Sequence, residues 1–166
     1  MGMVFVSVTR LHLRSPFDFP AFGWNLLLTT WQIINTPGFL GGKLLQDANR
    51  TFWTMTTWDE QTAMKIYRNS GAHRSVMPKI QDWCDEASVV HWRQDDSSLP
   101  NWREAHYRLV TKGFLTKLSK PSPAHLKRDI PEPMSPRDLP LRPRRRNAEN
   151  IVHQGKSFSL LRWVMR

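Results

Sequence analysis

Residues 51–92 read TFWTMTTWDEQTAMKIYRNSGAHRSVMPKIQDWCDEASVVHW, and this stretch carries the strongest structural signals in the chain. It holds four of the eight tryptophans, the only cysteine and two of the six histidines. The aromatic and threonine residues up to Trp58 predict a strand, and the acidic pair that follows places negative charge where a helix begins. Ser70-Gly71 divides that helix into two pieces, and residues 87–93 alternate as a strand does. The stretch therefore predicts a strand, a two-part helix and a second strand.

The residues before this stretch predict three further elements. Residues 3–13 alternate and are apolar on both faces at their start, which is typical of a central strand. Residues 20–35 repeat apolar side chains at helical spacing behind an N-terminal proline. Residues 39–46 and 50–58 form a hairpin about a short turn. The order β-α-β-β-α-β predicts an α+β fold of the ferredoxin-like type.

The residues after the stretch divide the rest of the chain. We assign 1–95 to the ferredoxin-like domain, 96–119 to a linker with an extra helix over 102–118, and 120–166 to a basic, Pro-rich extended tail. Seven of the twelve prolines lie at or after Pro121, and such composition favours an extended segment unless other residues hold it. The tail becomes apolar again over 157–166.

The positive charge is concentrated in the tail. The formal net charge is +10; residues 1–119 carry 13 Lys/Arg against 10 Asp/Glu, and residues 120–166 carry 11 against 4. A basic tail suits an acidic protein partner, although it also suits a solvated segment. The candidate partner-binding residues share charge or apolarity in the tail: Arg142, Arg144, Arg145, Arg146, Phe158 and Trp163. Specific nucleic-acid binding is disfavoured because no recognition helix or aromatic platform accompanies the arginines.

Several classes of protein are excluded by what the sequence does not contain. One cysteine, Cys84, cannot form an intrachain disulfide, and no Cys/His spacing typical of a metal site occurs. No secretory signal and no apolar run long enough to cross a membrane is present. We therefore expect a soluble, cytoplasmic protein without a metal site, and one that does not span a membrane.

Residues 51–80, TFWTMTTWDEQTAMKIYRNSGAHRSVMPKI, carry a resemblance to a known family. With the pattern over 3–93, they resemble the dimeric α+β barrel superfamily, its antibiotic-biosynthesis-monooxygenase-like domains and, more closely, its spheroidene-monooxygenase-like proteins. The resemblance implies a homodimer whose sheets pair face to face. It also implies a pocket in each subunit, between its sheet and its own helices.

The resemblance also indicates which residues line that pocket. In the haem-degrading branch an Asn, a Trp and a His surround the ligand; Thr9 stands at the position of the Asn, while Trp58 and His73 match the other two. Thr lacks the amide N–H of Asn, which leaves haem binding open and argues against haem degradation. We expect Phe5, Thr9, Trp58 and His73 to line the pocket and His73 to be the catalytic or ligating residue. A structural role for the imidazole is the competing interpretation.

Two functions remain open from the sequence. The first is a monooxygenase-like protein that acts on or binds an aromatic, polyene or tetrapyrrole molecule, with haem as the one cofactor to test. The second is a non-catalytic, dimeric assembly factor that docks on a larger complex through its basic tail.

Overall fold

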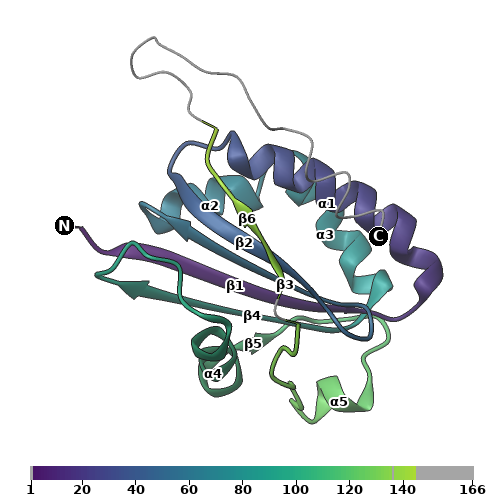
Figure 1. Cartoon of the computed structure of the whole chain (residues 1–166). Helices are drawn as coiled ribbons and strands as arrows, with labels where there is room; N and C mark the ends of the chain where they lie inside the picture. The colour runs from purple at the N-terminus through teal and green to yellow at the C-terminus, as the bar shows by residue number, and fades with distance from the viewer. Residues whose placement is uncertain (1, 136, 145–166) are drawn as a thin grey trace.

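The computed structural model describes residues 2–135 and 137–144 and confirms the β-α-β-β-α-β order (Figure 1). The elements of this repeat are β1 (Val4–Leu13), α1 (Phe19–Ile34), β2 (Phe39–Asp47), β3 (Thr51–Trp58), α2 (Gln61–Arg68), α3 (Gly71–Trp83) and β4 (Cys84–Gln94). A short 3-10 turn, Pro16–Asp18, precedes α1. The elements that follow are α4 (Trp102–Lys112), β5 (Phe114–Leu115), α5 (Pro123–Leu126) and β6 (Asp138–Leu141).

One antiparallel sheet contains every strand of the described residues, in the order β5-β4-β1-β3-β2-β6. β1 is central, as its apolar start predicts, and pairs with β3 on one side and β4 on the other. The register places Phe5 opposite Trp58 and Ser7 opposite His91. Because successive side chains alternate between faces, this register fixes which residues of the three strands share a face.

Helices α1, α2 and α3 cover one face of the sheet (Figure 1). Phe22 of α1 and Ile80 of α3 pack with Phe52 of β3 in one buried cluster, and Ile33 and Trp58 belong to a second. The predicted division of the helical stretch is confirmed: α2 ends at Arg68, and α3 begins at Gly71, whose φ of +55° suits glycine.

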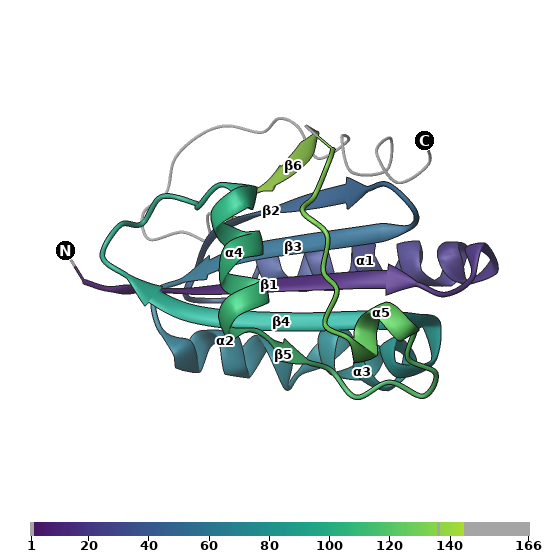
Figure 2. The ribbon, with the colours of Figure 1, turned by 90° about the horizontal axis from the view of Figure 1, so that it is seen from below.

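Helix α4 covers the opposite face (Figure 2). Its Ala105 and Leu109 pack on Trp53 and Met55 of the sheet, and all four side chains have no exposed surface. This is the face that the resemblance assigns to a partner's sheet. Where α4 covers this face, a helix of the same chain occupies the position that the partner's sheet would take.

The extra helix is shorter than the predicted 102–118. It ends at Lys112 because the backbone turns at Gly113, where a Cβ atom would lie 2.2 Å from the carbonyl oxygen of Leu109. Such an approach is open only to glycine. The chain then runs into β5 instead of continuing as a helix.

The described part of the tail is held against the domain. Ser122 caps α5, and the ring of the buried His125 lies near the backbone N–H of Ala87, on β4, and the carbonyl of Thr116. β6 pairs with β2 at the edge of the sheet, with Leu141 opposite Gly42 and buried. Pro140 is tolerated there because an edge strand needs fewer N–H donors.

Candidate functional site

A cavity of about 270 Å³ lies between the sheet and helices α1, α2 and α3. Three of the four predicted pocket residues, Thr9, Trp58 and His73, line it. Phe5 does not line it directly, but its ring stacks on that of His91, a lining residue, with centroids 5.5 Å apart. The structure therefore brings the four predicted residues to one region of the molecule.

The strand faces explain this convergence. Thr9 on β1 lies opposite Thr54 on β3, and both line the cavity. Ser7 on β1 lies opposite His91 on β4, and both line it as well. Alternation along the strands therefore sets a row of hydroxyls and one imidazole beneath the helices.

Trp58 forms a wall of the cavity and part of the core. Its side chain is fully buried, and its indole N–H donates to the hydroxyl of Thr56 at 3.0 Å. Its ring packs edge-on against Phe39 and lies 5.5 Å from that of Tyr67. Because its N–H already has a partner, Trp58 offers a ligand an aromatic surface and no free donor.

His73 is held in one orientation at the start of α3. Its backbone N–H donates to Oε1 of Gln32 at 2.8 Å, and its ring lies 4.7 Å from that of Tyr67. Its Nδ1 lies 3.2 Å from the carbonyl oxygen of Arg68. A carbonyl oxygen only accepts, so Nδ1 carries the proton and Nε2 is left as an acceptor. Burial lowers the pKa of His73, with the charge of Arg68 a smaller cause, so the imidazole is neutral at pH 7.

His91 is the lining residue that sequence reasoning missed. Its Nδ1 is buried and has no hydrogen-bond partner among the described residues. Burial, and secondarily the charge of Arg68, lower the pKa of His91. The sequence did indicate which strand face His91 occupies, because alternation along 87–93 places it on the same face as Val89. One strand does not show which residue it will pair with, so the sequence could not bring His91 to Ser7 and into the cavity.

The cavity has a polar and an apolar end. Trp58, Ser7 and His91 lie toward the start of β1, and Arg68 and His73 come from the helices above. The other end of the cavity is lined by apolar side chains from β1, β3, α1 and α3: Leu11, Phe52, Phe22, Val76 and Ile80. The arrangement suits a ligand with one polar or acidic group on a mainly apolar body.

Two more lining residues, Thr116 and Leu141, come from beyond the ferredoxin-like repeat. Leu141 belongs to β6, which the sequence did not predict because the Pro-rich composition around it favours an extended tail. The tail segment therefore contributes to the wall of the cavity.

One potential metal-binding group is found in the described residues, and it lies outside the cavity. His12, Asp85 and Glu86 have ligand atoms within 4.8 Å of one another. The guanidinium of the buried Arg10 donates to Glu86 at 2.6 Å, and Ser122 donates to the other carboxylate oxygen. Because Arg10 already supplies a positive charge to Glu86, and His12 contacts Asp85, we assign no cation to this group.

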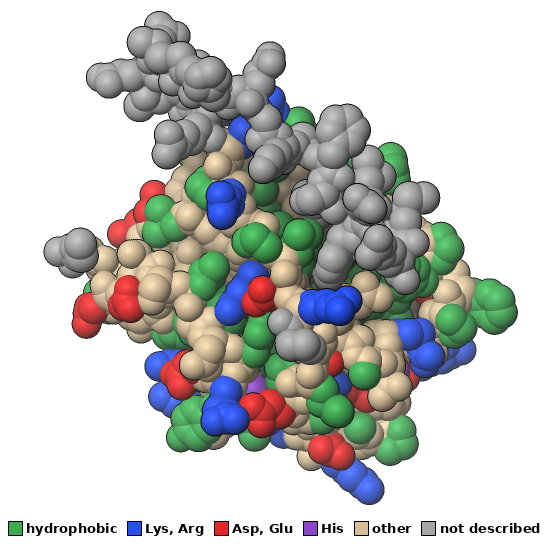
Figure 3. Space-filling view, in the orientation of Figure 1, with side chains coloured by type: hydrophobic (Ala, Val, Ile, Leu, Met, Phe, Trp, Pro, Cys, Tyr) green, Lys and Arg blue, Asp and Glu red, His purple; other side chains and the backbone are tan. Residues whose placement is uncertain are grey.

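The tail residues predicted to bind a partner are only partly covered by the structure. Arg142 is exposed, whereas Arg144 contacts α1 of its own chain. Arg145, Arg146, Phe158 and Trp163 lie outside the described residues. On the face shown in Figure 3, basic and acidic side chains are interspersed.

No protein-family model matches the chain, and no curated protein matches it either. Solved structures do match. They show that the chain has the fold of proteins described as antibiotic biosynthesis monooxygenases.

The match to a putative antibiotic biosynthesis monooxygenase from Nitrosomonas europaea has a TM-score of 0.52 at 16% identity, and covers 59% of this chain and 96% of that chain. Rv0793 from Mycobacterium tuberculosis matches with a TM-score of 0.52 at 14% identity, over 57% and 99%. A conserved protein from Methanosarcina mazei Go1 matches with a TM-score of 0.51 at 11% identity, over 56% and 94%. At these identities the likeness shows the fold alone. It leaves about two fifths of this chain without a counterpart.

Within the described ranges, none of the helices is both long and apolar enough to cross a membrane.

Proposed function

We propose that the cavity binds a small, mainly apolar molecule and that the protein is monooxygenase-like, with His73 as the catalytic residue. One observation carries the proposal: His73 and His91, whose Nδ1 has no hydrogen-bond partner among the described residues, line one end of a mainly apolar cavity, beside the positive charge of Arg68. Phe5, Thr9 and Trp58 shape the same region. Aromatic and polyene compounds with an acidic oxygen are the ligand classes that this arrangement favours.

The chemistry follows from the state of the imidazole. With its proton fixed on Nδ1, His73 can accept a proton at Nε2 from an acidic CH₂ group conjugated to a carbonyl. The charge of Arg68 then stabilises the enolate that forms. The enolate supplies two electrons to O₂, a C–O bond forms, and the O–O bond breaks with loss of water. In total, CH₂ and O₂ become C=O and H₂O.

Haem fits this site less well than a smaller ligand does. His73 presents the donor that haem iron uses, a neutral imidazole whose other nitrogen is held. The cavity volume of about 270 Å³, however, is slightly below the roughly 300–1,000 Å³ of small-molecule pockets, and a tetrapyrrole is a large ligand. No step of the proposed reaction therefore involves haem.

The proposal is tested with two probes: dithranol, a three-ring anthrone with an acidic CH₂ group, and retinoic acid, a polyene carboxylate. We expect saturable binding of at least one by calorimetry, and dithranol-dependent oxygen uptake. His73→Ala should lower the uptake rate by about 100-fold or more, the range of general-base catalysis, while changing the Kd for dithranol much less.

His106→Ala is the matched control, because His106 lies on α4, across the sheet from the cavity, where its Nε2 donates to the carbonyl of Ile130. It should leave binding and uptake unchanged. Failure of both probes to bind saturably would refute the pocket. Binding without oxygen uptake would refute the monooxygenase activity alone.

A homodimer and a cytoplasmic location remain parts of the proposal. The covered face constrains the dimer: Trp53 and Met55 are already buried under α4, so a second copy cannot pack on the area that α4 covers. The assembly role through the basic tail stays a prediction, and the engagement of Arg144 with its own chain does not favour it.

A further inference from the structure

The outer face of α1 is an apolar surface that the described residues leave exposed. Trp24, Leu28 and Trp31 recur at spacings of four and three residues, and are 62%, 40% and 56% exposed. We call these three residues the α1 stripe. The helix, FPAFGWNLLLTTWQII, contains no charged residue, and its other face is buried against the sheet. A helix that is apolar on both faces is typically covered on both faces.

The α1 stripe continues into a shallow hollow at one end. Leu28 and Trp31 line this hollow together with Pro37 and Ile66, and Ile66 of α2 is itself exposed. The apolar surface therefore spans two helices. Contiguous exposed apolar surface of this kind marks an interaction site more often than isolated apolar residues do.

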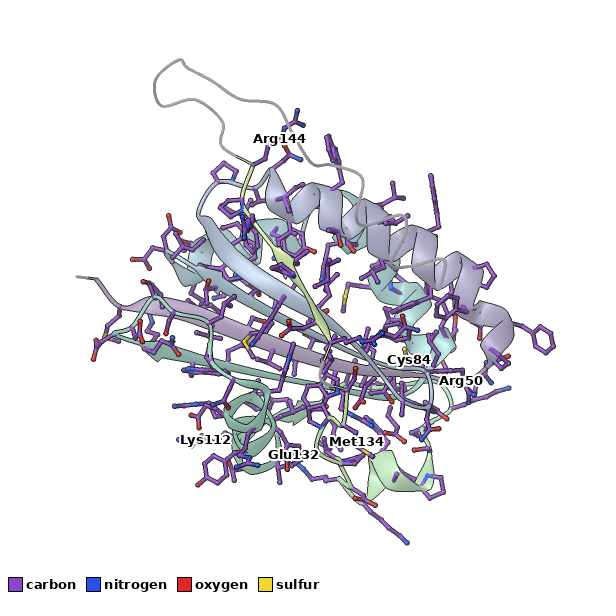
Figure 4. The ribbon with its side chains drawn as sticks, in the orientation of Figure 1. Arg50, Cys84, Lys112, Glu132, Met134 and Arg144 are labelled. Carbon is purple, nitrogen blue, oxygen red and sulfur yellow. The ribbon has the colours of Figure 1, made fainter. Side chains whose placement is uncertain are left out.

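The tail reaches this surface at the point where the described chain ends. The backbone N–H of Arg144 donates to the carbonyl of Ile34 at 2.7 Å, and its guanidinium lies 5.1 Å from the ring centroid of Trp31. Figure 4 shows Arg144 near that end of α1. A cation at the C-terminus of a helix is favoured by the helix dipole, and one over an indole ring by the ring electrons. The described chain therefore ends beside one end of the α1 stripe.

The 22 residues from 145 to 166 contain a matching apolar segment. Residues 145–157 are mainly polar, and residues 158–164 carry Phe158, Leu160, Leu161, Trp163 and Val164. The stripe is about 10 Å long, because Trp24 and Trp31 are separated by seven steps of ~1.5 Å along the helix. The polar residues 145–157 can span up to about 40 Å at ~3.3 Å each. The apolar segment is thus within reach of the whole stripe.

We propose that residues 158–164 bind the α1 stripe of the same chain. The segment is tethered beside its surface, and a short tether gives an effective concentration in the ~mM range. A second copy of the chain or a lipid surface would have to compete with it. The proposal does not depend on the function of the cavity.

Cross-linking in the full chain tests the proposal. Cys84 is replaced by Ala, and one new cysteine is placed beside the stripe by Ala21→Cys and another in the segment by Ser159→Cys. The control pair uses Tyr107→Cys, on α4 across the sheet, where Tyr107 is 62% exposed, as Trp24 is. With a short bismaleimide, the first pair should cross-link within one chain at least ~10-fold faster than the control pair.

Two results would overturn the proposal. Equal rates for the two pairs would show that the segment does not dock on α1. Cross-linked dimers from the first pair would show that a second copy supplies the occupant.

A second measurement uses the full chain with Trp163→Glu. We expect it to bind more of a dye that fluoresces on apolar surfaces than the parent chain does, and the increase should disappear when Trp24→Glu and Trp31→Glu are added. An increase that persists in the triple variant would place the segment elsewhere. Sedimentation of the parent chain, but not of Trp163→Glu, with phosphatidylserine-containing vesicles would replace the proposal with a membrane-binding segment.

Discussion

Replacement of Leu109 by Ala tests whether α4 covers the outer face of the sheet in solution. Leu109 has no exposed surface and packs with Trp53, Met55 and Val8 in one buried cluster. Leu→Ala at such a site removes apolar contacts and leaves a cavity, at a cost of about 2–5 kcal/mol. For a chain of this length, each kcal/mol lowers Tm by roughly 2–4 °C. A loss of about 3 kcal/mol therefore corresponds to a Tm lower by about 6–12 °C.

The assay is urea and thermal unfolding followed by circular dichroism, with Val110→Ala as the matched control. Val110 is the next residue of α4 and is 42% exposed, so its replacement should change the free energy of unfolding by no more than about 0.5 kcal/mol. Ligand affinity of folded Leu109→Ala should be unchanged, since α4 and the cavity lie on opposite faces. A loss below about 1 kcal/mol, or equal losses for both variants, would show that α4 does not pack on this face.

Three further predictions concern buried titratable groups. Glu86→Gln leaves the guanidinium of Arg10 buried without its anion, and should lower the free energy of unfolding by about 3–5 kcal/mol; a loss under 1 kcal/mol in urea would contradict the buried ion pair. The pKa of Cys84 is raised to about 12, mainly by burial, so a thiol-reactive disulfide should label the native chain at pH 8 at least ~100-fold more slowly than the chain in urea; similar rates would place Cys84 at the surface. His73 and His91 have lowered pKa values in the folded chain, so the unfolded chain binds more protons below about pH 6.5, and stability should fall with decreasing pH by up to ~1.4 kcal/mol per pH unit for each histidine. Replacing both by Gln should flatten that slope, and an unchanged slope would assign it to other groups.

The sequence alone determined the order of the elements and much of the candidate site. Alternation assigned Thr9 and Trp58 each to one particular face of its strand, and the break at Ser70-Gly71 placed His73 at the start of a helix. These are local properties, because strand alternation and helix ends depend on residues close in the chain. The resemblance to a known fold then implied that these residues share a cavity. The solved structures confirm the fold.

Only the tertiary structure decided the other features. His91 joins the cavity through its pairing opposite Ser7, Leu141 does so through an edge strand in a Pro-rich segment, and α4 covers part of the sheet face that the resemblance assigns to a partner. Each depends on contacts between residues far apart in the sequence, and no local pattern specifies which strands pair or which face a helix covers. The free energy that settles those choices comes from burial of apolar side chains such as Trp53 and Leu109, which exists only once the packed elements meet.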